Sequence, residues 1–133
     1  MKKTVAWMIL AVAASACGSG GSPEDTEANL ASIQENVFDT TCATSGCHDS
    51  ASAEGDLDLS DADTAYKQLV GVAAVDDDAG GLERVTAGNA ADSVIIMRIS
   101  GTDLGPRMPQ GNAVLPEKAI AAITKWINDG AKK

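Results

Sequence analysis

The first regular hydrophobic pattern in the body of the chain lies just ahead of a pair of cysteines. Leu30, Ile33 and Val37 are spaced three and four positions apart among polar residues, as expected for the buried face of an amphipathic helix. The spacing predicts a helix over residues 27–40 that runs directly into Cys42.

A similar stripe occurs at the end of the chain. Pro116 suits the first position of a helix, and Gly130 suits the end of one. Between them, one helical face carries three isoleucines with a tryptophan beside them: Ile120, Ile123, Ile127 and Trp126. This pattern predicts a last helix that buries its isoleucine face.

Two shorter helices are predicted from capping signals. Ser60 followed by Asp63 resembles a capping box, and the helix that it opens would end at Gly71 with its Tyr66, Leu69 and Val70 face inward. Asn89 with Asp92 repeats the device ahead of residues 94–99. The β-branched residues in this run also suit a short strand, but the cap favours a helix.

No internal repeat and no clear strand pair accompany these patterns. We therefore expect an all-α fold of about four helices, with long loops at residues 71–88 and 101–115.

The composition provides few large apolar side chains for a hydrophobic core. The chain has 133 residues, enough for one ordinary domain. Much of its 44% hydrophobic fraction is alanine, which buries little surface. Beyond the first sixteen residues the aromatic residues are Phe38, Tyr66 and Trp126 alone. A domain of this size is already marginal in buried surface, so the composition argues against a generously packed enzyme core.

The N-terminal segment has the pattern of an export signal. Residues 1–16 combine two lysines, an apolar run and a small-residue end at Ala14-Ser15-Ala16. Cys17 follows and opens a Gly/Ser-rich stretch, so residues 17–28 are predicted to be a flexible tether with a lipid anchor at Cys17. The alternative is ordinary cleavage that leaves a free thiol. Residues 29–133 form the predicted domain.

Charge narrows the choice of partners. The net charge is −9, and without Lys2 and Lys3 of the signal eight basic residues face 19 acidic ones. This balance argues against nucleic acid and anionic membranes as partners. We expect membrane contact through the lipid anchor only, on the periplasmic side of a bacterial membrane, and a protein partner with a basic docking surface.

The stretch with the clearest chemistry is Cys42-Ala-Thr-Ser-Gly-Cys47-His48. Two cysteines, the second followed at once by histidine, form the attachment pattern of covalently bound haem c. Each thiol adds to one haem vinyl group, and the histidine binds the iron. The common pattern has two residues between the cysteines. This chain has four, and Ser45-Gly46 can form the bulge that the longer spacer needs.

A second axial ligand is available in a later loop. Met108 lies between Pro106 and Pro109 in a glycine-bounded loop, and a thioether opposite an imidazole raises the potential of haem iron. Met97 lies in an apolar helical run, where core filling is the expected role. Arg84, Arg98 and Arg107 are candidates to pair with haem propionates.

With these motifs in view, residues 30–131 resemble a small monohaem cytochrome c domain of the planctomycete type, on a bacterial lipoprotein. The matching segments are Val37-Phe38, Cys42 to His48, Gly55 to Ser60, Tyr66 with Leu69-Val70, Val85 to Asn89 ahead of Ser93, Met108-Pro109, and Ile123 to Ala131. The resemblance implies thioether bonds at Cys42 and Cys47, His48 as proximal ligand and Met108 as distal ligand. It also implies that the first and last helices cross, through Phe38 and Trp126.

Three other sites compete for these residues. A Cys42–Cys47 disulfide would make the chain a haem-free interaction lipoprotein, and this alternative stays open. Zinc is disfavoured because His48 is the single histidine and no further cysteine pair supplies ligands. An EF-hand at Asp56-x-Asp58-x-Ser60 is rejected, because Asp61 stands where glycine is required and Lys67 where the bidentate glutamate belongs.

The sequence thus predicts an exported single-haem electron carrier that cycles between Fe(III) and Fe(II) with both axial ligands bound. Such a carrier needs no catalytic acid or base, so we expect no enzymatic activity. An accessory role to an oxidoreductase stays open. The haem would also fill the poorly supplied core, wrapped by six aliphatic residues: Leu57, Leu59, Val94, Ile95, Leu104 and Ile123.

Overall fold

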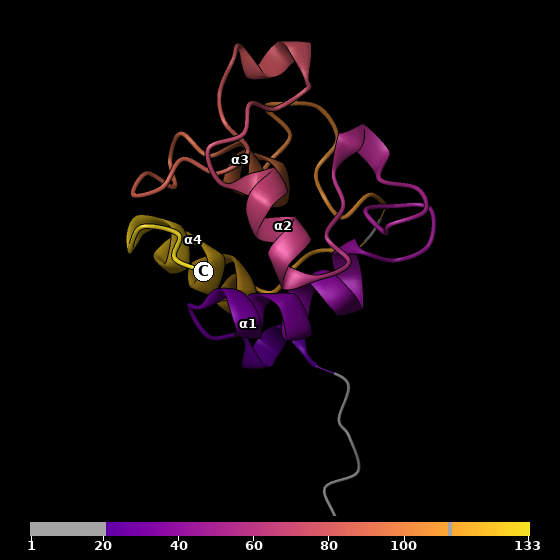
Figure 1. Ribbon diagram of the computed structural model, residues 1–133, viewed down its shortest axis with the longest axis vertical. Coiled ribbons are helices and arrows are strands. Elements are labelled where there is room, and N and C mark those ends of the chain that lie inside the picture. Colours follow the sequence, from indigo (N-terminus) through magenta and orange to yellow (C-terminus); the bar gives the residue numbers. More distant parts are fainter. Residues whose placement is uncertain (1–20, 112) are drawn as a thin grey trace, which may run out of the picture.

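The computed structural model describes residues 21–111 and 113–133, and these form four helices joined by long loops (Figure 1). The first is α1 (Leu30–Ile33), which continues without a break into η2 (Gln34–Cys42); α2 (Ala62–Leu69), α3 (Val94–Ser100) and α4 (Glu117–Asn128) follow. The described residues contain no strand, and two isolated bridges are their only extended pairings. The expected all-α fold is confirmed.

The first helix starts and ends slightly later than the hydrophobic pattern predicts. Asn29 caps it, with its side-chain oxygen accepting a hydrogen bond from the Ser32 N–H at 2.9 Å, so the helix begins at Leu30 and not at residue 27. From Gln34 onward it has the wider π-helical form. The last hydrogen bond runs from the Ala43 N–H to the Phe38 carbonyl at 2.8 Å. The helix thus ends at Cys42.

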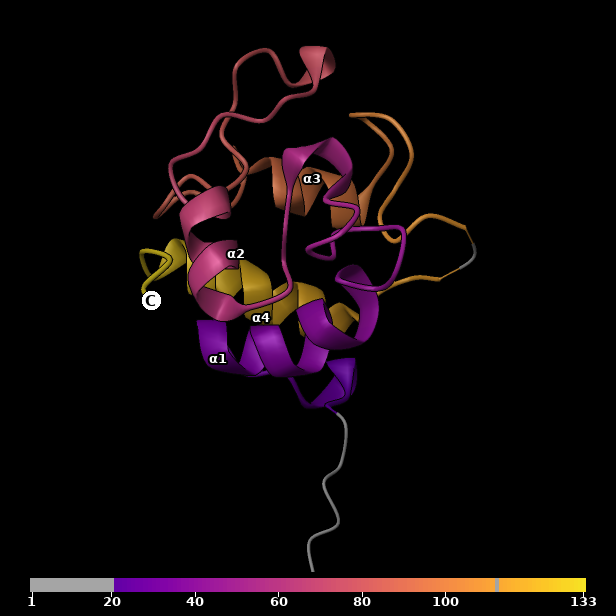
Figure 2. The ribbon, with the colours of Figure 1, turned by 45° about the vertical axis from the view of Figure 1, so that its right-hand side comes forward.

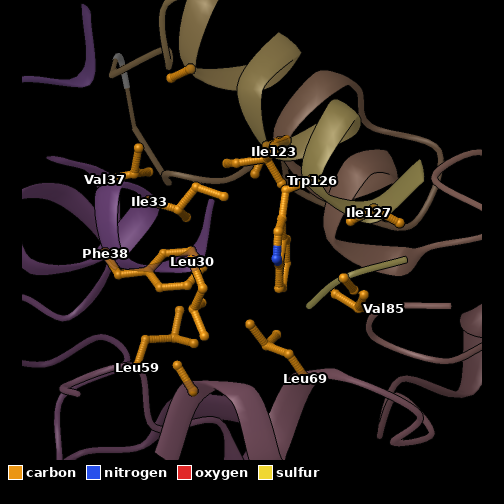
Figure 3. Close-up of a cluster of buried hydrophobic side chains, with 14 of the residues drawn as sticks. Leu30, Ile33, Val37, Phe38, Leu59, Leu69, Val85, Ile123, Trp126 and Ile127 are labelled. Carbon is orange, nitrogen blue, oxygen red and sulfur yellow. The ribbon is translucent and has the colours of Figure 1, made fainter. Parts of the chain in front are cut away.

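The core lies where the first and last helices meet. Helix α1 packs against α4 and α2, and α3 packs against the other side of α4 (Figures 1 and 2). Phe38 and Trp126 are 1% and 2% exposed and belong to one buried cluster (Figure 3). The Trp126 indole N–H donates to the Lys132 carbonyl at 2.7 Å, which satisfies its polar edge.

The capping signals locate the two middle helices but misplace their first turns. Asp61, one residue after the predicted Ser60, caps α2 by accepting from the N–H groups of Asp63 and Thr64, both at 3.0 Å. The Asn89–Asp92 pair instead closes a separate turn, after which α3 begins at Val94. The 94–99 run is helical and not a strand.

The segment ahead of the first helix packs on the domain. A short turn, η1 (Pro23–Asp25), contacts both η2 and α4, and the Ser22 N–H donates to the Asn36 side-chain oxygen at 2.9 Å. Thr26 is buried. Packing therefore begins before the predicted domain start at residue 29. The predicted signal at 1–16 and the Cys17 anchor lie outside the described residues.

No helix within the described residues has both the length and the apolar character needed to cross a membrane.

Candidate functional site

The helices and loops enclose an apolar cleft of about 380 Å³. Its walls come from η2, the 48–59 loop, the end of α2, the 74–84 segment, α3, the loop before α4, and α4 itself. Five of the six aliphatic residues that the sequence assigned to this centre line it, namely Leu57, Leu59, Val94, Ile95 and Ile123. Leu104 does not, because the loop after α3 keeps it half-buried away from the cleft.

His48 lies on the cleft wall with its imidazole held by the backbone. Its Nδ1 is 3.3 Å from the Leu57 carbonyl oxygen. Since a carbonyl can only accept, Nδ1 carries the proton and Nε2 keeps a free lone pair for a metal. The main chain of His48 is fixed as well, because its N–H donates to the Cys42 carbonyl at 3.1 Å and its carbonyl accepts from Leu59 at 2.8 Å.

The two cysteines have different surroundings. Cys42 lines the cleft, and its burial, with Cys47 as a smaller contribution, raises the pKa of its thiol to about 12. Cys47 is exposed and is not among the cleft residues. Between them, Gly46 has a φ of +82° in a turn closed by the Cys47 N–H to the Thr44 carbonyl. Both cysteines are free thiols, so the structure contains no Cys42–Cys47 disulfide.

Met108 reaches the cleft from the loop between α3 and α4. It is half-buried and packs against the core. Its backbone N–H donates to the Arg98 carbonyl on α3 at 2.7 Å, which ties the methionine to a helix. Met97 lies outside the cleft and outside the core cluster, so its expected core-filling role is not seen.

The three candidate arginines occupy different positions. Arg84 and Arg98 line the cleft, whereas Arg107 does not. Arg98 pairs with Asp76 at 2.6 Å. Arg107 has a buried Nε with no hydrogen-bond partner among the described residues. Arg84 is 7% exposed, and its burial lowers the pKa of its guanidinium, an effect that Asp56 and Asp76 oppose.

This donor set fits a flat, apolar metal cofactor. One cleft brings together an oriented imidazole, a thioether and the thiol of half-buried Cys42 among aliphatic walls. No group of three or more His, Cys, Asp or Glu side chains that could hold a metal ion occurs within 21–111 and 113–133. Imidazole and thioether are both known protein ligands of haem iron, so the side chains that line this cleft suit that group.

Two contacts of this site could not be found in the sequence. The Leu57 carbonyl that orients His48 is a backbone atom nine residues away, and its place depends on the path of a loop. The hydrogen bonds of Arg84 likewise go to backbone carbonyls. No residue-type pattern indicates either of them.

A comparison with protein families gives one match. The family model described as Planctomycete cytochrome C matches residues 45–112, a little more than half of the chain. The matched segment includes Cys47, His48 and Met108, and Cys42 lies just ahead of it. No curated protein and no solved structure matches the chain.

Proposed function

Because the chain belongs to the planctomycete cytochrome c family, we propose that it is an exported electron carrier with one covalently bound haem c. His48 and Met108 are its axial ligands, and Cys42 and Cys47 are its attachment sites. The observation that carries the proposal is the apolar cleft that is lined by an oriented imidazole, a thioether and the thiol of half-buried Cys42.

When bound, haem supplies an iron that alternates between the ferric and ferrous states. The chain's own groups determine how that iron is held. The Leu57 carbonyl keeps the proton on His48 Nδ1 and so presents Nε2 as a ligand. The Arg98 carbonyl restrains Met108 through its backbone N–H. The aliphatic walls would exclude water from the bound haem. This would raise the free energy of the more highly charged ferric state relative to the ferrous state.

In this proposal His48 and Met108 would both bind the iron, so a substrate would have no free coordination site. An acid or base is not required either, since an electron carrier makes and breaks no bond in its partner. We accordingly propose that the protein is an electron carrier and not an enzyme. It could serve as an accessory protein of an oxidoreductase.

The proposed location is the periplasmic side of a bacterial membrane, with Cys17 as the lipid anchor. The support is the export pattern of residues 1–16 and the cysteine directly after it. The proposed redox partner has a basic docking surface. Ten carboxylates and one lysine occur between residues 43 and 83, and Glu54 and Asp76 from this segment line the cleft.

The test is the absorption spectrum of the haem-loaded protein in both oxidation states. We expect a low-spin haem with a methionine-to-iron charge-transfer band in the ferric form. A high-spin spectrum would count against the carrier, because it indicates an open coordination position suited to ligand sensing or peroxidase chemistry.

A further inference from the structure

The loop that carries the His48 partner is held by a residue distant in sequence. Arg84 Nη2 donates to the carbonyl of Gly55 at 2.8 Å and to that of Asp56 at 3.1 Å. Both N–H bonds of this nitrogen are therefore used on two successive peptide groups. The next carbonyl along the chain belongs to Leu57, and this is the one that accepts from His48.

The same guanidinium ties the loop to helix α2. Arg84 Nη1 donates to the Gln68 carbonyl at 3.0 Å, and the Gln68 side-chain oxygen accepts from the Asp58 N–H at 2.7 Å. The backbone is thus held on both sides of Leu57. Only a planar guanidinium presents donors in the directions that three separate carbonyls need.

The segment that Arg84 holds has an unfavourable backbone conformation. Gly55 and Asp56 both lie in the left-handed region, with φ of +67° and +55°, which costs free energy for a non-glycine residue such as Asp56. Such a turn persists when its surroundings fix it. The two hydrogen bonds from Arg84 to these residues do so.

The burial of Arg84 also calls for an explanation. Its hydrogen bonds go to carbonyls and none to a carboxylate, although removing a cation from water is costly. A neutral side chain of similar length would fill the same space at a lower cost of desolvation. The feature that an apolar side chain cannot supply is the set of donors to the Gly55 and Asp56 carbonyls.

We propose that Arg84 is a positioning residue for the His48 ligand, acting through the Gly55 and Asp56 carbonyls on the Leu57 carbonyl. Because a peptide group is planar, fixing the Asp56 carbonyl also fixes the Leu57 nitrogen and Cα. The Leu57 carbonyl then sets the plane of the imidazole and keeps the proton on Nδ1. This inference rests on the proposed function, since it concerns how His48 is presented to the iron.

The test is the exchange of the His48 Nδ1 proton with solvent, followed by NMR in the reduced, diamagnetic holoprotein. In Arg84→Met we expect exchange about tenfold faster or more, the factor that corresponds to losing roughly one hydrogen bond. In Arg84→Lys we expect a smaller increase of the same sign, because an ammonium keeps the charge but cannot reach all three carbonyls. Gln68→Met, which releases Asp58, should act in the same direction.

The matched control is Arg98→Met. It removes another cleft-lining guanidinium, its pair with Asp76 and its hydrogen bond to the Pro106 carbonyl. None of its hydrogen bonds goes to the 55–58 backbone, so the Nδ1 exchange should stay within about twofold of the wild type. This comparison separates a positioning effect from a general loss of charge or stability.

Wild-type exchange in Arg84→Met would overturn the proposal. If that variant does not take up haem, unchanged exchange in both Arg84→Lys and Gln68→Met would overturn it. A wild-type protein that shows no haem-ligated His48 would overturn the proposed function, and the role of Arg84 with it. The two failures can be told apart. If only the role of Arg84 is wrong, the wild-type protein still shows the NMR signal of a haem-ligated His48.

Discussion

His48 and Met108 both come from loops, and each donates a hydrogen bond to a main-chain carbonyl. His48 donates to the Leu57 carbonyl, and the Met108 N–H donates to the carbonyl of Arg98 on α3. Loops commonly carry functional groups that a rigid scaffold positions. In this chain the partner of each proposed ligand is a main-chain carbonyl, that of Leu57 in a loop for His48 and that of Arg98 on α3 for Met108.

Residues whose type is required by the covalent chemistry of haem attachment could be predicted from the sequence. Thioether attachment followed by ligation requires Cys47 directly before His48, and this adjacency is visible in the sequence. The partners that orient the ligands are carbonyls, which every residue has. Their identity depends on the three-dimensional path of the loop, so Leu57 and Arg98 could not be predicted.

At the residue scale, replacing Met108, the proposed distal ligand, should change the properties of the iron without unfolding the protein. In Met108→Ala we expect loss of the charge-transfer band and a fall in reduction potential of more than about 0.1 V, within the ~0.8 V range that axial ligands set. Redox titration followed by absorption measures both. Met97→Ala is the matched control, because Met97 lies outside the cleft, and its spectrum should match the wild type.

At the scale of elements, hydrophobic periodicity predicted the first and last helices with their buried faces, and capping signals predicted the two middle helices. Ile123 and Ile127 are buried on α4 as predicted. The ends were less accurate, because Ser60 and Asp61 both suit an N-cap and the choice between them depends on backbone angles. Asp61 has the extended conformation of a cap, with φ −149° and ψ 155°, and its carboxylate oxygen is within reach of two N–H groups.

Helix α2 provides a stability prediction with its own control. Hydrogen bonds from Thr64, and secondarily from Asp63, hold the pKa of the Asp61 carboxyl below its usual 3.8. Asp61→Ala should therefore lower Tm by a few degrees at neutral pH, as expected for the loss of an N-cap. Ser60→Ala should leave Tm nearly unchanged, because Ser60 makes no capping bond in the structure.

The pH dependence of this difference follows from the direction of the pKa shift. A carboxyl with a lowered folded-state pKa stabilises the fold above its unfolded value, and this contribution is lost as pH falls through the folded pKa. The Tm difference between wild type and Asp61→Ala should thus shrink below about pH 4. A constant difference from neutral to acid pH would contradict the charged cap.

At the scale of the whole molecule, the small number of large apolar side chains corresponds to an apolar cleft in the structure. Beside the packed cluster that contains Phe38 and Trp126, the helices and loops enclose an apolar cleft of about 380 Å³. The low aromatic content and the small-residue composition pointed to this from the sequence. The shape of the cleft did not follow, because it depends on how the loops at 48–59 and 101–116 close over the helices.

Removal of the cofactor should accordingly destabilise the fold. The same chain produced without haem-maturation machinery should unfold less cooperatively, with Tm lower by more than roughly 10 °C, equivalent to a few kcal/mol for a domain of this size. Calorimetry of the haem-free and haem-loaded proteins measures the difference. If the haem-free and haem-loaded proteins unfold with the same cooperativity and the same Tm, the core is complete without the cofactor and this prediction is wrong.

The uneven charge of the molecule predicts salt-dependent electron exchange. With a cationic small-molecule redox reagent, the rate should fall as ionic strength rises from about 0.01 to 0.15 M, where the Debye length shortens from ~30 to ~8 Å. With an anionic reagent the rate should rise as ionic strength rises. Glu54→Gln should reduce the salt dependence of the rate with either reagent. Stopped-flow kinetics with a neutral reagent provides the control, and trends of reversed sign would exclude a basic docking partner.

The central claim is that Cys42 and Cys47 bind one haem covalently in this cleft. The most direct test is mass spectrometry of the intact protein produced with haem-maturation machinery, followed by digestion to locate the modified peptide. We predict the mass of the chain plus one haem, carried by the peptide that contains residues 42–48. A haem-free mass two protons below that of the reduced chain would instead indicate a Cys42–Cys47 disulfide and would contradict the claim.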